Sequence, residues 1–230
     1  LAAAAIAAHA AWLGDTLEPA GGLSLGLADS ASLMGLAIGF GGLLAVFRPR
    51  FRTVAAVCLG LAALLAAGTG SMPEPREIAA SGWPLALHVV LAMGSAGMFA
   101  IAAVLVVLLA LQDSALRRGH TGGWLATLPP VESLERALFS VIVTGEAALT
   151  VAILAGLLFV TDLFAQHLIH KTVLALIAWA IFACLLVGHW RFGWRGRTAA
   201  RYTIAGFVVL ALAYFGSKFV LEILLGRHWG

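Results

Sequence analysis

The sequence predicts an all-α, polytopic membrane protein, and three observations support this fold class. Of the 230 residues, 62% are apolar and 11% are charged, whereas a soluble domain has about 45–50% and about 25%. The mean hydropathy is +1.01. The apolar residues gather into runs close to the length of about 20 that a helix needs to cross a bilayer. Since so few charges would leave the surface of a soluble globule uncovered, the composition excludes most soluble enzymes, disordered proteins and nucleic-acid binders.

Seven apolar runs are the expected spanning helices, and together they form a single transmembrane domain over residues 1–230. Their expected bounds are 1–13, 30–47, 53–71, 83–111, 137–161, 168–190 and 201–225. Uninterrupted period-two alternation is not seen, which argues against a barrel. The first run is short and begins at Leu1 rather than at Met, so we expect further residues before it.

Basic residues concentrate in alternate loops, and this gives the expected orientation. The loops at 48–52, 112–136 and 190–201 carry most of the arginines, whereas the other loops are mainly acidic. The positive-inside rule places the basic loops in the cytoplasm and the C-terminus outside. Tryptophans near the predicted helix ends are typical of the interface: Trp12, Trp83, Trp190, Trp194 and Trp229. The pattern is typical of a multi-pass protein of the bacterial inner membrane, with the lipid bilayer as a partner and no nucleic acid.

Five of the seven histidines fall near the expected outer face. They are His9, His88, His167, His170 and His228, whereas His120 and His189 lie on the cytoplasmic side. Imidazole is a common axial ligand of haem iron, and a ligand pair needs two histidines from different helices at equal depth. His88, His9 and His228 meet this condition. An interfacial histidine without a ligand is the alternative for each of them.

A bare metal ion is less well supported than haem. Zinc prefers three or four ligands that include thiolates or carboxylates. Cys58 and Cys184 stand alone inside apolar runs, so zinc, redox and covalent c-type haem motifs are missing.

Few charged residues lie inside the apolar runs. Glu146 lies about ten residues into its run, where a carboxyl is costly and usually faces a partner or a cavity. Lys171 and Lys218 lie near the outer face. They either hold haem propionates, which need cationic partners when partly buried, or extend to the interface. Lys218 also has a possible i,i+4 partner in Glu222.

Several segments carry a family resemblance. They read LHVVLAMGSAGMFAIA at 87–102, PPVESLERALF at 129–139, HKTVLALIAWAIFACLLVGHWRFGWRGRTA at 170–199 and GFVVLALAYFGSKFV at 206–220. The most specific piece is GWRGR at 193–197. Through these segments the chain resembles, over essentially its whole length, the cytochrome c assembly (CcsA/CcmC-like) family, and most closely its YpjD/HemX-type branch.

The resemblance implies roles for four histidines. In haem-handling members, two outer histidines are axial ligands, which here implies non-covalent haem b. His88 matches the first of them by its position at the start of its helix, and His228 is similar to the second. His9 matches a histidine in an early helix of the branch, and His189 lies near where some members carry a membrane-embedded histidine. The branch usually has eight helices, so the resemblance implies one more than the seven found here.

One segment departs from the haem-delivering members of the family. Those members carry a Trp-rich outer loop, whereas this chain reads TDLFAQHLIH at 161–170, without Trp. The resemblance therefore implies handling or sensing of haem at the outer, periplasmic face rather than its delivery to apocytochrome c.

Three functions stay open at this point. The first is the haem-binding protein just described, working with haem-handling or other membrane proteins. The second is an accessory or structural subunit of a larger membrane complex without haem of its own. The third is an ion transport protein or regulator that uses Glu146. Paired carboxylates, a nucleophile elbow and a phosphate loop are not seen, so no catalytic residue is predicted.

Overall fold

The structure is a computed structural model that describes residues 2–17, 23–24, 27–67, 77–78, 83–119, 122–159 and 169–216. Most of these residues form seven α-helices: α1 (Ala2–Leu17), α2 (Leu27–Val46), α3 (Arg52–Ala67), α4 (Trp83–Arg117), α5 (Val131–Phe159), α6 (Ile169–Phe192) and α7 (Gly196–Ala211). The predicted all-α fold class is confirmed.

Five short elements complete the described fold. The 3-10 helices η1 (Pro49–Phe51) and η3 (Gly123–Thr127) lie in loops, and the π-helical turn η4 (Leu212–Gly216) continues α7. The two-residue strands β1 (Leu23–Ser24) and β2 (Glu77–Ile78) pair antiparallel, with Leu23 opposite Ile78.

Proline marks the start of three helical segments. Pro49 begins η1, Pro84 is the second residue of α4, and Pro130 directly precedes α5. Proline suits these positions because the first N–H groups of a helix have no intrahelical acceptor. At α5 the backbone N–H of Ser133 donates to the carbonyl of Pro130 at 2.8 Å, and Glu132 places a negative charge in the first turn, which complements the helix dipole.

Five helical segments within the described residues are long and apolar enough to cross a membrane. They are Pro49–Ala67, Ala86–Arg117, Val131–Leu158, Lys171–Phe192 and Gly196–Gly216, while Ala2–Gly14 and Ser30–Val46 are shorter apolar helices. A polytopic helical membrane protein is therefore supported. That the first two helices also span the bilayer stays a prediction.

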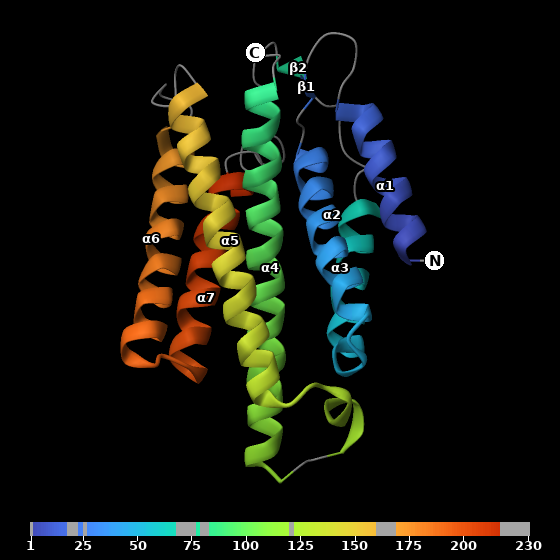
Figure 1. Ribbon diagram of the computed structural model, residues 1–230, viewed down its shortest axis with the longest axis vertical. Helices are drawn as coiled ribbons and strands as arrows, with labels where there is room; N and C mark the ends of the chain where they lie inside the picture. The colour runs from blue at the N-terminus through green and yellow to red at the C-terminus, as the bar shows by residue number, and fades with distance from the viewer. Residues whose placement is uncertain are drawn as a thin grey trace.

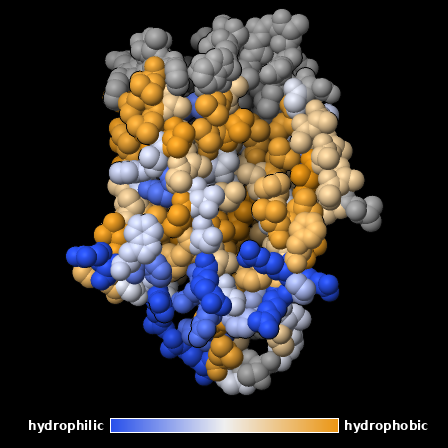
Figure 2. Space-filling view, in the orientation of Figure 1, coloured by the Kyte–Doolittle hydropathy of each residue, from blue (hydrophilic) through white to orange (hydrophobic). Residues whose placement is uncertain are grey.

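The helices stand roughly side by side in one bundle (Figure 1). The central helix α4 packs against α5, α2 and α7, while α1 packs mainly against α2. The three basic connections, α2–α3, α4–α5 and α6–α7, lie toward the same end, the lower end in Figure 1. Figure 2 shows hydrophilic residues gathered there, below a broad hydrophobic band. The grouping of the basic loops agrees with the prediction, and the assignment of this end to the cytoplasm remains an application of the positive-inside rule.

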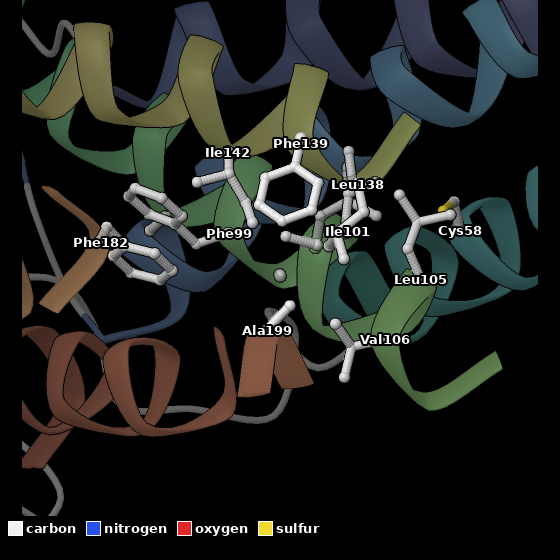
Figure 3. Packing of buried hydrophobic residues seen from close by; sticks show 14 of the residues in the cluster. Cys58, Phe99, Ile101, Leu105, Val106, Leu138, Phe139, Ile142, Phe182 and Ala199 are labelled. Carbon is white, nitrogen blue, oxygen red and sulfur yellow. The ribbon is translucent and has the colours of Figure 1, made fainter. Parts of the chain in front are cut away.

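The main hydrophobic core surrounds α4 and takes residues from α2, α3, α5, α6 and α7 as well (Figure 3). At its centre the rings of Phe99 and Phe182 stack with their centroids 3.7 Å apart and an interplanar angle of 11°. Small residues let the helices reach these rings, since a Cβ at Gly206 would lie 2.7 Å from Phe182 and a Cβ at Gly145 would lie 3.2 Å from Phe99. Close packing of this kind holds helices together in lipid, where the hydrophobic effect supplies little.

A second cluster of buried residues lies nearer the upper end of the bundle in Figure 1. We call it the upper cluster, and its buried members are Leu13, Leu33, Ala92, Met93 and Ala152. It joins α1, α2, α4 and α5, and Tyr214 of η4 packs against it. The candidate site borders this cluster.

Candidate haem site

His88 is held in a defined orientation by the backbone of a neighbouring helix. It lies near the start of α4, half-buried, and its Nδ1 is 2.8 Å from the backbone carbonyl oxygen of Ala152 on α5. Since a carbonyl oxygen only accepts, Nδ1 carries the proton and donates. Nε2 is then the nitrogen with a free lone pair, and a histidine fixed in this way through its other nitrogen is the usual arrangement of a metal ligand.

His9 is bonded through the opposite ring nitrogen. Its Nε2 lies 2.6 Å from the hydroxyl oxygen of Ser32 on α2, and Ser32 is fully buried. The Trp12 ring is 6.4 Å away, tilted by 35°. In this conformation Nε2 of His9 is occupied by Ser32, and Nδ1 is the ring nitrogen that remains for another ligand. Iron can bind to Nε2 only if the bond to Ser32 breaks.

Both histidines border the upper cluster. His9 precedes Leu13 by four residues, and His88 precedes Ala92 by four, so each lies on the same helix face as a cluster member. Ser32 is adjacent to Leu33 in α2, and Ala152 is itself a member. The structure therefore brings His9 and His88 to one end of the bundle, as the sequence predicts.

His189 lies at the other end of the bundle. In the last turn of α6 its Nδ1 donates to the carbonyl of Trp194 at 3.0 Å, and its ring stacks on Phe139 with centroids 3.5 Å apart. The structure does not bring His189 together with His88.

The remaining predicted site residues are placed only in part. Lys171 lies half-buried in the first turn of α6, which begins at the upper end of the bundle (Figure 1). His228 and Lys218 lie outside the described residues, so their roles stay predictions.

Glu146 lies in the core below the site. It is 8% exposed, and neither carboxyl oxygen has a hydrogen-bond partner among the described residues. Its backbone carbonyl accepts from the Thr150 hydroxyl at 2.7 Å, and that hydroxyl accepts from Trp179 Nε1 of α6 at 2.9 Å. The helix segment around Glu146 is thus tied to α6, whereas its carboxyl is not tied to any described group.

Sequence reasoning did not identify Ser32 and Ala152 as partners of the histidines. Ser32 carried a signal, because it is a polar residue inside an apolar run. Ala152 carried none, because it contributes its backbone carbonyl, which every residue has.

His88 offers one donor of the kind that haem iron takes. Among the residues that the structure describes, no group of three or more His, Cys, Asp or Glu side chains is placed to hold a metal ion. Haem iron needs only one or two axial ligands from the protein, and an oriented imidazole such as His88 meets that requirement.

Comparison with known proteins agrees with this reading of the fold. The model of the family described as "Cytochrome C assembly protein" matches residues 25–225. The chain belongs to this family. The "Inner membrane protein YpjD" of Escherichia coli K12 is 36% identical over 138 residues, which cover 60% of this chain and 52% of that protein. The "Cytochrome c biogenesis protein CcsA" of Microcystis aeruginosa is 33% identical over 112 residues, 46% of this chain and 34% of that protein.

A third relative and the solved structures complete the comparison. The "Uncharacterized 28.8 kDa protein in nifR3-like 5'region" of Azospirillum brasilense is 31% identical over 163 residues, 69% of this chain and 60% of that protein. The aligned part thus spans 52% of the YpjD protein, 34% of the CcsA protein and 60% of the Azospirillum protein. No solved structure matches. With its apolar helices and its YpjD and CcsA relatives, the chain is a multi-pass inner membrane protein of the cytochrome c assembly family.

Proposed function

We propose that this protein handles or senses haem at the periplasmic face of the membrane, and that it holds haem b non-covalently with His88 as one axial ligand. The observation that carries the proposal is the 2.8 Å bond from His88 Nδ1 to Ala152. It fixes the tautomer and leaves Nε2 for iron. Family membership supports the choice of haem, because relatives carry the name cytochrome c biogenesis protein.

The second axial ligand is His228, with His9 as the alternative. His9 lies at the same end as His88 but gives its Nε2 to Ser32. A cofactor that engages Nε2 of His9 therefore has to displace this serine, whereas His228 is proposed on the family resemblance alone. His189 is the weakest candidate, because it lies at the opposite end and is held by Trp194 and Phe139.

Lys171 and Lys218 are proposed to hold the two propionates. Lys171 is half-buried at the upper end, where α6 begins. A lysine at that depth can reach a carboxylate while its stem stays among apolar groups. When bound, haem supplies a redox-active iron and a large apolar ring, while the protein supplies the ligands, the cationic partners and the exclusion of water.

The test is an absorbance spectrum of the detergent-purified protein, oxidised and reduced, with a pyridine haemochrome assay. We expect haem b near one equivalent in the wild type and loss of the Soret band in His88→Ala. His189→Ala is the matched control, since it also removes a half-buried imidazole but should keep the spectrum. A normal Soret band in His88→Ala refutes the ligand assignment. A colourless wild type that stays colourless after incubation with hemin refutes haem binding and favours an accessory subunit of a larger complex.

A further inference from the structure

The turn between α2 and α3 carries a dense group of positive charges on a fixed backbone. We call residues 47–52, FRPRFR, the arginine turn. The backbone N–H of Arg48 donates to Ala45 at 3.1 Å, and that of Phe51 donates to Arg48 at 2.8 Å. Pro49 fixes a further backbone dihedral. The three guanidinium groups, of Arg48, Arg50 and Arg52, therefore extend from a preorganised loop.

These charges have no counter-charge in the described part of the chain. No ion pair of the described residues involves Arg48, Arg50 or Arg52, whereas Arg117 pairs with Asp113 at 3.0 Å. Neither η1 nor α3 has an acidic residue in its first turn, and no side chain caps η1. The positive end of a helix favours anions and disfavours arginines. The start of α3 therefore presents three exposed guanidinium groups and no carboxylate.

The arginine turn also contains a notch that is apolar as well as cationic. The notch has a volume of about 360 Å³ and is lined by Phe47, Arg48, Pro49, Arg50 and Phe51. Phe47 is 76% exposed, so its ring is available to an apolar group. A ligand that covers these rings and satisfies the guanidinium groups must carry both apolar and anionic parts.

The neighbouring loop continues this surface. The hydroxyl groups of Thr53 and Thr127 lie 2.8 Å apart, which ties the start of α3 to η3. In η3, Trp124 is 53% exposed, and exposed tryptophan is typical of the headgroup region of a bilayer. The arginine turn therefore lies where the ends of two apolar helices meet the lipid headgroups.

We propose that the arginine turn is a binding site for the phosphate of an anionic phospholipid. Guanidinium groups bind phosphate oxygens in a bidentate way, while the exposed Phe47 contacts the glycerol and upper acyl chain. This inference does not depend on haem binding, since it concerns the opposite end of the bundle and other residues.

The proposal is tested by native mass spectrometry of the delipidated full chain, titrated with dioleoyl-phosphatidylglycerol or dioleoyl-phosphatidylcholine. The variant is Arg48→Gln, Arg50→Gln, Arg52→Gln. The matched control removes three arginines from the same end that already bond to their own segments: Arg117→Gln, Arg118→Gln, Arg136→Gln. We expect binding of phosphatidylglycerol to fall by about tenfold or more in the variant. In the control it should fall by about twofold or less, because those arginines already bond to Asp113, Ser114 and Ser133.

A second variant guards against a change in membrane topology. Replacing all three arginines of the turn by lysine keeps the positive charge and loses the bidentate geometry, so phosphatidylglycerol binding should weaken while phosphatidylcholine binding is unchanged. Equal losses in the glutamine variant and its control overturn the proposal, because the attraction is then diffuse. Complete displacement of phosphatidylglycerol by excess inorganic phosphate also overturns it, because the ligand is then a soluble phosphate rather than a lipid.

Discussion

An added methyl group between α4 and α5, introduced by Gly145→Ala, should weaken haem binding although it does not contact the haem site. Gly145 lies seven residues before Ala152, two helical turns away on the same face of α5. A Cβ at Gly145 would lie 3.1 Å from the Met98 Cβ and 3.2 Å from the Phe99 ring. Neither neighbour yields easily, because the Met98 Cβ is fixed to the backbone of α4 and Phe99 is stacked on Phe182.

Gly145→Ala should therefore push α5 away from α4 by a few tenths of an ångström. The shift lengthens and tilts the bond between His88 Nδ1 and the Ala152 carbonyl, now 2.8 Å. A neutral hydrogen bond contributes about 0.5–1.5 kcal/mol net. If this bond no longer contributes its free energy to orienting the ligand, hemin should bind about 2- to 12-fold more weakly.

The assay is a hemin titration of the detergent-purified protein, followed at the Soret band. Gly94→Ala is the control, since a Cβ at Gly94 meets nothing within 4 Å, and it should bind hemin like the wild type. Unchanged hemin affinity in Gly145→Ala, or an equal loss in Gly94→Ala, refutes the reasoning.

Two further predictions concern the stability of the bundle, measured as the midpoint of thermal unfolding in detergent. Gly206→Ala places a Cβ 2.7 Å from the stacked Phe182 ring, so the free energy of unfolding should fall by about 1–3 kcal/mol. The control Gly94→Ala should leave this free energy unchanged or raise it. Equal midpoints in the two variants would contradict the packing argument. Glu146→Met replaces a buried carboxyl that has no hydrogen-bond partner among the described residues by an apolar chain of similar length. The free energy of unfolding should therefore rise by about 1–3 kcal/mol, and a lower midpoint would show that the carboxyl has a stabilising partner.

Hydropathy located the helices but not their full lengths. The predicted run at 83–111 is α4, which continues to Arg117, and the predicted run at 137–161 is α5, which begins at Val131. Both extensions lie at the end that carries the basic loops and contain charged residues such as Glu132. Apolar runs report the part of a helix that contacts lipid, whereas the polar turns beyond it follow from proline and from charges near the helix ends.

The partners of the histidines follow from tertiary packing, which one sequence does not contain. His9 and Ser32 are 23 residues apart, and His88 and Ala152 are 64 apart. The sequence indicated that His9 and His88 share one end of the bundle because alternating helix direction fixes depth. It did not indicate which ring nitrogen each histidine uses, because this depends on the rotation of α1 and α4 against their neighbours.

The most specific family motif proves to be a structural turn. In GWRGR, Gly193 and Gly196 have φ of 67° and 56°, a conformation that other residues adopt at a cost. The backbone N–H of Trp194 donates to the carbonyl of Gly188 at 3.2 Å, and the Trp194 carbonyl accepts from His189. A Cβ on Gly188 would collide with the Trp194 ring. The motif therefore shapes the connection between α6 and α7.

This placement changes what the resemblance can support. A motif that fixes a turn is retained by any member that keeps the fold, with or without haem. A residue that binds a cofactor is instead recognised by a geometry that suits the cofactor. The half-buried imidazole of His88 donates to the carbonyl of a neighbouring helix, as metal-ligating histidines usually do. Haem binding by this chain is thus supported by His88 and its bond to Ala152 rather than by GWRGR, and the His88→Ala spectrum tests it.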